Sequence, residues 1–389
     1  MPAAAPISAT PARDIRFDAL RGLMLLSMTS NHLPTDLRVL TDQGLGIVSS
    51  AEGFVFLSGL LAGFVYGRRL IRDGASRLRT AAWHRAGTIY RWHIASYFAA
   101  FVLLALNAWI TGMHSDTSPP LFANKPLLAM LLGPVLLYQP GLLDILPMYC
   151  LFVLLLPPVL GALEKGRRWL VLGISFAVWA MVQFLPNYDG SLIAPPLNFG
   201  FFNVLAWQFL FISGIVIGQA KTKGAGPLVP VRPGLLAAAI AGAVFFFGLS
   251  HRFIPSLWPD RDFGIMLNKP SLGALRLMSF ALVAYLVAVV GTRFPRLLAW
   301  RPLAMLGRHS LFVVSMQSVI VLVLLAHDNL FATQTGCWIV TIATLATLFT
   351  VTAIYEKLSR RTADPALVYP GRLLPPFAAA KGQEQPRAA

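Results

Sequence analysis

Three ionisable side chains share the apolar stretch FDALRGLMLLSMTSNH at residues 17–32. A helical residue turns by about 100° and rises about 1.5 Å, so Asp18, Arg21 and His32 fall on one side of a helix, with about 16 Å between Arg21 and His32. Ionisable groups at membrane depth are costly and usually face a bundle interior or a water-filled cavity. The stripe therefore predicts a polar site inside a helical bundle. The structural alternatives are a local Asp18–Arg21 pair with a snorkelling arginine and a buried histidine that is hydrogen-bonded to a carbonyl group.

A carboxylate stands at the start of the next apolar stretch, AEGFVFLSG at residues 51–59. We predict Glu52 at the depth of His32, and Gly59 and Gly63 on nearly the same face would let the first helix approach closely. A carboxylate that orients an imidazole makes a general base able to take a proton from a hydroxyl group. In the alternative interpretation, Glu52 is a solvated residue near a helix start.

Membrane-spanning helices must position these residues. Of the 389 residues, 56% are hydrophobic and 12% are charged, whereas a soluble domain carries about 25% charged residues. Apolar runs of roughly 20 residues predict transmembrane helices. We therefore predict an all-α polytopic membrane protein with about ten transmembrane helices. The expected spans are residues 17–36, 52–68, 91–112, 143–163, 169–185, 199–219, 234–250, 274–292, 303–326 and 335–356.

The net charge of +16 is distributed unevenly along the chain. If the N-terminus is cytoplasmic, most Lys and Arg residues fall in cytoplasmic segments, as the positive-inside rule describes. The basic composition is thereby explained without nucleic acid, and both termini are predicted to be cytoplasmic. Cys150 and Cys337 both lie in apolar runs and suggest neither a disulfide nor a metal framework.

The segment 126–139 is apolar but has only about 14 residues, too few to span about 30 Å. Prolines around it favour an irregular path, and we expect one short re-entrant or interfacial segment there. Residues 1–12 predict a disordered N-terminal tail, residues 13–358 the transmembrane domain, and residues 359–389 a cytoplasmic C-terminal tail.

Several stretches taken together resemble the OpgC family of bacterial inner-membrane proteins, which belongs with the wider type-three acyltransferases. Arg21 and His32 reproduce the superfamily's pattern of Arg, ten residues and His in the first helix. The resemblance covers most of residues 13–325. It is carried further by AEGFVFLSGLLAGFVYGRR at 51–69, IYRWHI at 89–94, LDILPMY at 143–149, FNVLAWQFLFISG at 202–214 and LGRHSLFVVSMQ at 306–317. The chain departs from the expected pattern at Val204, where a proline is expected.

The resemblance implies an inner-membrane acyltransferase domain. OpgC-like proteins are implicated in moving a succinyl group from cytoplasmic acyl-CoA to osmoregulated periplasmic glucans. Succinyl-CoA, or else acetyl-CoA, would then be a co-substrate, with no permanently bound cofactor and no metal. In this mechanism His32, oriented by Glu52 or Asn31, removes a hydroxyl proton, and Arg21 holds the donor or its thioester oxygen. An acyl-histidine intermediate is an alternative.

An anionic donor that enters from the cytoplasm needs cationic residues on that side. We expect Arg85 and Arg91, which border the third span, to contact donor phosphate, with Arg308 as a further candidate. His93 could hydrogen-bond the amide arm of the donor, and Gln208 could line the acyl path. The structural alternatives are topology signals for the arginines, packing for His93 and an interhelical hydrogen bond for Gln208.

The acceptor sugar must enter from the opposite side. Asp144 and Tyr149 are expected wall residues of a sugar site, and Asp18 is a further candidate substrate contact. Lys269 and Arg276 could pair with a succinyl carboxylate as it emerges. For charged loop residues, the structural alternative is simple solvation.

Two other functions stay open on the sequence alone. Intramembrane ionisable residues are also typical of proton-coupled transporters, although no inverted repeat of broken helices is visible. A third possibility is a related enzyme that acetylates another glycan. The expected partners are the lipid bilayer, acyl-CoA and a glycan, without nucleic acid, and the sequence leaves the oligomeric state open.

Overall fold

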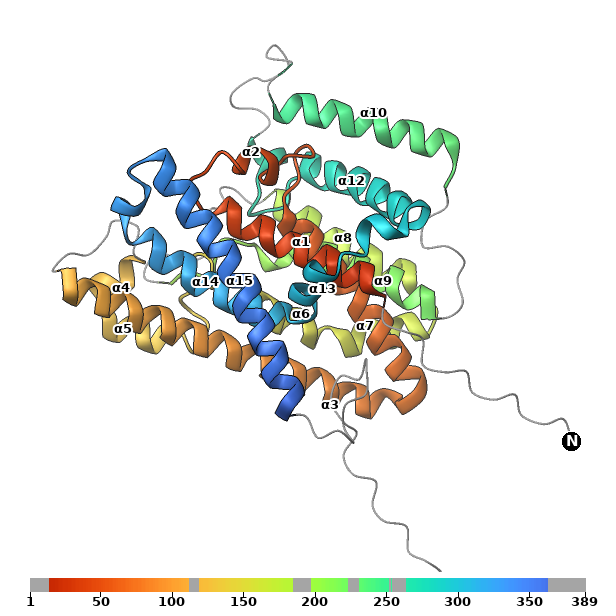
Figure 1. The fold of residues 1–389 in the computed structure, drawn as a ribbon. Coiled ribbons are helices and arrows are strands. Elements are labelled where there is room, and N and C mark those ends of the chain that lie inside the picture. The colour runs from red at the N-terminus through yellow and green to blue at the C-terminus, as the bar shows by residue number, and fades with distance from the viewer. Residues whose placement is uncertain are drawn as a thin grey trace, which may run out of the picture.

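Figure 1 shows a computed structural model of the protein. The structure describes residues 14–111, 119–184, 197–222, 231–251, 253 and 264–362. The predicted tail at 1–12 lies outside these residues, as does the part of the tail at 359–389 that follows Thr362.

The described residues are helical throughout, apart from loops and one isolated β-bridge between Tyr138 and Asn198. In chain order the helices are α1 (Ile15–Asn31), α2 (Arg38–Thr41), α3 (Ser50–Thr111), α4 (Pro120–Asn124), α5 (Pro126–Leu132), α6 (Ile145–Leu154), α7 (Leu156–Glu164), α8 (Arg168–Gln183), α9 (Val204–Thr222), α10 (Pro233–Ser250), α11 (Gly264–Leu267), α12 (Ala274–Arg293), α13 (Arg301–Arg308), α14 (Ser310–Leu325) and α15 (Gln334–Thr362), with the short 3₁₀ helices η2 (Pro295–Leu298) and η3 (Asp328–Phe331).

The prediction of an all-helical protein with apolar helices able to cross a membrane is confirmed. Among the described residues, six helices, with α6 and α7 counted together, are long and apolar enough to cross, and the bent pair α13–α14 makes a seventh. Each predicted span coincides with part of a helix or of a bent pair, but α1 has 17 residues and α8 has 16. The total of about ten spans stays a prediction.

Helix α3 consists of two arms that meet at Gly74, whose φ of 81° and ψ of 173° favour a residue without a Cβ. Figure 1 shows the chain folding back at this point, at the lower right. The sequence predicted a loop between the spans at 52–68 and 91–112, whereas the structure continues both helices up to the glycine. The second arm is about 55 Å long, more than the hydrocarbon core of about 30 Å, so its arginine-rich start can project beyond the membrane.

Four glycines form a close backbone contact between α3 and α9. A Cβ at Gly59 would overlap a backbone carbonyl of α9, and a Cβ at Gly214 would overlap a backbone carbonyl of α3. Gly63 and Gly218 repeat the pattern one turn further along. The prediction that Gly59 and Gly63 pack against the first helix was wrong. The matching glycines that permit backbone contact lie on α9.

Helix α1 instead makes its close contact with α13. A Cβ at Gly22 would overlap the carbonyl oxygen of Leu303, and a Cβ at Gly307 would overlap that of Asp18. After α13 the chain bends by 85° at His309 and continues as α14. The two glycines therefore fix the position of this bend relative to α1.

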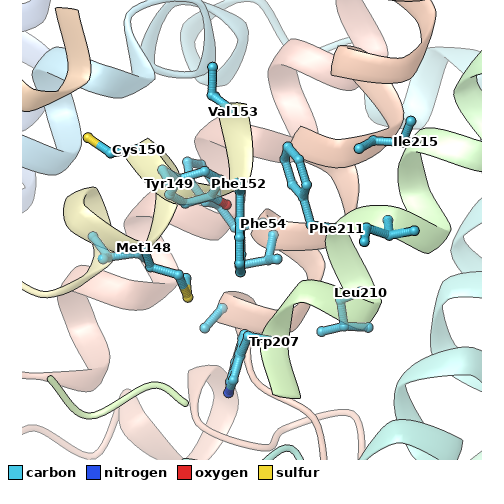
Figure 2. Packing of buried hydrophobic residues seen from close by; sticks show 14 of the residues in the cluster. Phe54, Met148, Tyr149, Cys150, Phe152, Val153, Trp207, Leu210, Phe211 and Ile215 are labelled. Atoms are coloured by element: carbon cyan, nitrogen blue, oxygen red, sulfur yellow. The ribbon is translucent and has the colours of Figure 1, made fainter. Parts of the chain in front are cut away.

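An aromatic core joins α3, α6 and α9 (Figure 2). The rings of Phe54 and Tyr149 meet edge to face with 5.9 Å between their centroids, and Phe152 stacks on Phe211 at 5.1 Å. Trp207 is fully buried at the start of α9. Aromatic side chains bury large apolar areas in fixed orientations, so this core sets the relative positions of three helices that lead to the polar residues.

Contacts between distant segments define two ends of the bundle. At one end, the Gln183 side chain of α8 donates to the Ser271 carbonyl over 2.9 Å, on the loop before α12. At the other end, Arg308 of α13 donates to the Glu356 carboxylate of α15 over 2.9 Å. We call these the His32 end and the Arg308 end, since Lys269, on the loop that contains Ser271, acts electrostatically on His32.

The segment 126–139 contains only the seven-residue helix α5. Such a helix is about 10 Å long, far short of a bilayer crossing. The Tyr97 hydroxyl of α3 donates to the Ala129 carbonyl over 2.9 Å, and the Gln139 N–H donates to the Asn198 carbonyl over 2.7 Å. The short, anchored helix favours a re-entrant or interfacial segment, and the choice between these two stays a prediction.

Candidate functional site

His32 lies immediately after the last residue of α1. Its backbone N–H caps the helix by donating to the carbonyl groups of Thr29 and Ser30. The residue is exposed, and within the described ranges its imidazole makes no hydrogen bond. The alternative of a buried histidine bonded to a carbonyl group is therefore wrong.

Glu52 is fully buried at the start of α3 and forms an ion pair with Arg276 of α12. The Arg276 Nη1 lies 2.6 Å from the Glu52 Oε1. The other carboxylate oxygen accepts hydrogen bonds from the Ser49 hydroxyl over 2.5 Å and from the Ser49 N–H over 3.0 Å. Arg276 is also buried, and its Nε donates to the Leu267 carbonyl over 3.2 Å. The alternative of a solvated Glu52 is wrong, since both charges are paired inside the protein.

The predicted hydrogen bond between Glu52 and His32 is not formed in the described structure. A guanidinium carries a full charge and several donors, so it is a stronger partner for a carboxylate than a neutral imidazole. The Lys269 ammonium acts electrostatically on both the Glu52 carboxylate and the His32 imidazole. We call these four residues, His32, Glu52, Lys269 and Arg276, the polar cluster.

Two buried tryptophans hold the loop that carries Lys269. The Trp207 indole donates to the carbonyls of Lys269 and Pro270 over 3.2 Å and 3.0 Å, and the Trp179 indole donates to the Leu272 carbonyl over 2.9 Å. Both tryptophans lie on helices of the bundle, α9 and α8. The backbone at Lys269 is therefore fixed relative to the rest of the polar cluster.

Asn31 acts on the loop after His32 rather than on the imidazole. Its Nδ2 donates to the Thr41 carbonyl over 3.0 Å, and the Ser27 hydroxyl donates to the same carbonyl over 3.1 Å. The Ser50 hydroxyl donates to the Ser27 hydroxyl over 2.6 Å. These contacts join the end of α1, the following loop and the start of α3.

Arg21 lies deeper in the bundle than His32. Its Nη2 donates to the Ser310 hydroxyl over 2.5 Å at the start of α14, and its guanidinium lies 5.5 Å from the centroid of the Phe54 ring. About 16 Å of helix separates it from His32. Asp18 is buried one turn before Arg21 and already has an interaction partner, which argues against a contact with substrate.

Two buried glutamines join neighbouring helices. The Gln208 Oε1 accepts from the Ser175 hydroxyl over 2.6 Å, and its Nε2 donates to the Ser175 carbonyl over 2.8 Å. Gln317 accepts from the Thr29 hydroxyl over 2.7 Å. Because both polar atoms of Gln208 bind α8, the structure favours its interhelical role over lining an acyl path.

Asp144 and Tyr149 are both buried, although we expected them in the wall of an open sugar site. The Asp144 carboxylate accepts from the Phe201 N–H over 2.7 Å and so holds the segment before α9. Tyr149 is part of the aromatic core with Phe54. Burial against protein leaves neither side chain facing an open site.

His93 is fully buried on the second arm of α3. Its ring nitrogens meet no partner with full hydrogen-bond geometry, although the backbone of Gly133 and Leu143 lies beside them. Its ring centroid lies 6.0 Å from that of Tyr97. The surrounding protein favours packing over contact with a donor.

The three arginines predicted for the donor differ in their surroundings. Arg91 is exposed and donates only a long hydrogen bond of 3.4 Å, to Thr88. Arg85 lies on the same arm of α3, and neither residue forms an ion pair in the described part of the chain. Arg308 is engaged by Glu356. Arg85 and Arg91 are therefore better placed to bind an anionic donor than Arg308, whose charge is already paired with a carboxylate.

The sequence interpretation missed two serines that bind the charged residues. Ser49 precedes Glu52 by three residues, which is the spacing of a capping box, so this contact could have been predicted. Ser310 binds Arg21 across 289 residues, and no local pattern indicates such a contact. Nowhere in the described ranges do three His, Cys, Asp or Glu side chains gather as a metal site requires.

A model of the OpgC protein family matches residues 13–361, which is most of the chain. The match includes every residue of the polar cluster together with Arg21 and Ser310. No curated protein and no solved structure matches the chain.

Proposed function

Because the chain belongs to the OpgC protein family, we propose that it is an inner-membrane acyltransferase that moves an acyl group from cytoplasmic acyl-CoA to a hydroxyl of a periplasmic glucan. Family membership supports a transferase with a role in glucan modification. The succinyl group, the coenzyme A donor and the sidedness are the proposed refinements. In this proposal the His32 end faces the periplasm and the Arg308 end faces the cytoplasm.

The observation that carries the proposal is the state of His32. Its imidazole is exposed and makes no hydrogen bond in the described structure, yet the rest of the polar cluster is buried or fixed beside it. A general base must reach the proton that it removes. An exposed residue at the end of a helix satisfies that requirement, and the Glu52 carboxylate is held by Arg276 and Ser49 rather than by the imidazole.

The proposed step balances without a cofactor. The His32 imidazole removes the proton from the acceptor hydroxyl, whose oxygen attacks the thioester carbonyl carbon. A carbon–oxygen ester bond forms, the carbon–sulfur bond breaks, and coenzyme A leaves as the thiol after the proton returns to sulfur. The neutral imidazole acts first as the base, and the imidazolium that it becomes then acts as the acid.

Arg21 is suited to the donor rather than to the reacting carbonyl. The separation of about 16 Å from His32 is too large for both side chains to touch one carbonyl group. The Arg21 guanidinium, which is hydrogen-bonded to the Ser310 hydroxyl, can bind the phosphate-bearing or amide part of a long donor. Arg85 and Arg91, on the projecting arm of α3, would attract that donor from the cytoplasm.

The test is the mass profile of periplasmic glucans from cells that carry the wild-type protein, His32→Ala or no protein. His84→Ala is the matched control, because His84 is an exposed histidine on the arm of α3 far from the polar cluster. We expect a succinyl mass with wild type and His84→Ala, and none with His32→Ala or without the protein.

Other glucan mass profiles can be interpreted when all variants are present in the membrane at equal levels. An acetyl mass would keep the acyltransferase and replace the donor. Identical glucans in all four strains would overturn the proposal and favour another glycan acceptor or a proton-coupled transporter. A succinyl mass with His32→Ala would mean that His32 is not the general base of the reaction.

A further inference from the structure

We infer that Lys269 binds a carboxylate at the free end of the transferred acyl group and thereby selects dicarboxylic acyl groups over simple ones. The inference rests on the proposed acyl transfer at His32. It assigns the choice of acyl group to one side chain of the polar cluster, and it removes Arg276 from the pair of cations that the sequence suggested for this task.

The charges of the polar cluster leave Lys269 as its open cation. The buried carboxylate of Glu52 and the guanidinium of Arg276 neutralise each other at 2.6 Å. Lys269 forms no ion pair within the described residues, and its ammonium acts electrostatically on Glu52 and on His32, where the exposed guanidinium of Arg38 on α2 and the carboxylate of Asp42 also act. An anion that reached His32 would therefore meet a positive charge that has no tight partner.

Arg276 is less suited than Lys269 to serve as this cation, because the Glu52 carboxylate already neutralises its charge. Its Nη1 binds Glu52 and its Nε binds the Leu267 carbonyl, and the residue is buried. Taking its charge away from Glu52 would leave a carboxylate unpaired inside the protein, which is strongly unfavourable. Its part is to fix the start of α12 and the loop before it.

The loop around Lys269 is built to hold one conformation. Besides the two indole hydrogen bonds at its backbone, the Gln183 side chain donates to the Ser271 carbonyl over 2.9 Å. The Asn268 Oδ1 accepts from both the Ser271 N–H and the Ser271 hydroxyl, over 2.8 Å and 2.9 Å. A rigid backbone lowers the entropy lost when a ligand binds, so this lysine can discriminate between ligands that differ by one carboxylate.

A carboxylate beside the reacting centre could belong to the acyl group or to a substituent of the acceptor. A neutral glucan separates these sources, because only the acyl group can then carry the carboxylate. The experiment therefore uses the full chain in lipid vesicles, a neutral glucan as acceptor, and succinyl-CoA and acetyl-CoA as alternative donors. The readout is the ratio of kcat/KM for the two donors.

The variants are Lys269→Met, which removes the charge, and Lys269→Arg, which keeps it. Lys125→Met is the control, since Lys125 is an exposed lysine outside the polar cluster. We expect the succinyl-to-acetyl ratio to fall about tenfold or more in Lys269→Met, because a charge-assisted contact with the carboxylate is lost. The ratio should stay near the wild-type value in Lys269→Arg and Lys125→Met.

An unchanged ratio in Lys269→Met, or an equal fall for both donors, would overturn the inference and leave acyl transfer at His32 intact. A wild-type enzyme without preference for succinyl-CoA would do the same. If wild type transferred neither group, the proposed function itself would fail. Should Lys269→Met not fold, as judged by its thermal unfolding, Lys269→Gln provides the same charge removal with a polar end.

Discussion

The buried ion pair between Glu52 and Arg276 predicts strong energetic coupling between positions 224 residues apart. In Glu52→Gln the Arg276 guanidinium is left without a counter-ion, and in Arg276→Met the Glu52 carboxylate is left without one. Both remaining charges are buried. Leaving one buried charge unpaired costs about 3–5 kcal/mol of folding free energy. The double variant has no charge left to bury, so it should lose much less than the sum of the single losses.

The assay is a double-mutant cycle on the purified chain in detergent micelles. The free energy of unfolding is taken from denaturant titrations followed by tryptophan fluorescence, since Trp179 and Trp207 bind the loop before α12. We expect a coupling energy of at least about 2 kcal/mol, at the upper end of values for residues in contact. The Arg308–Glu356 pair is the control, because its side chains are 34% and 17% exposed. For such a pair we expect at most about 1 kcal/mol.

Additive single effects at Glu52 and Arg276, within about 0.5 kcal/mol, would refute the reasoning. They would mean that the two charges do not meet in the folded protein. The open cation assigned to Lys269 would then also be in doubt, because Arg276 would be available as a second one.

Two further predictions concern the helix contact and the donor. Gly59→Ala should lower the free energy of unfolding by about 1–3 kcal/mol, because its Cβ would overlap the backbone of α9. At Gly87 a Cβ would meet nothing within 4 Å, so Gly87→Ala should instead raise the free energy of unfolding by up to about 1 kcal/mol. Equal changes in both variants, measured by denaturant titration, would contradict the contact at Gly59. Ser310→Ala and Arg21→Gln should raise KM for acyl-CoA, with the larger effect in Arg21→Gln because a charge is lost. Initial rates against acyl-CoA concentration measure this, and an unchanged KM in both variants would place the donor elsewhere.

The sequence was sufficient for the class of fold and for the positions of most helices, because apolar runs of bilayer length are a strong local signal. It was not sufficient to predict which helices pack against each other. Gly59 and Gly63 indicated a close contact, yet the partner depends on where the complementary glycines are. Gly214 and Gly218 repeat the same spacing on α9, and pairing the two motifs would have identified the contact.

The candidate site was predictable in part for a related reason. The sequence identified His32 but placed it within the span 17–36, on a face toward the bundle interior, whereas α1 ends at Asn31 and His32 is exposed after it. The partner of Glu52 was not predictable, because Arg276 lies on a distant helix and helical periodicity gives only the face of a residue. Asp144 and Tyr149 were assigned by residue type alone, and their burial shows that type does not determine exposure.

The most direct test of acyl transfer at His32 is a stoichiometric assay with the purified protein in vesicles, acyl-CoA and a neutral glucan. Release of the coenzyme A thiol and formation of glucan ester are measured together in wild type and in His32→Ala. We predict one thiol released for each ester in wild type, and a loss of about 10²–10⁴-fold in rate in His32→Ala with unchanged thermal unfolding. Ester formation at the wild-type rate in His32→Ala, or thiol release that does not depend on the glucan, would contradict the account.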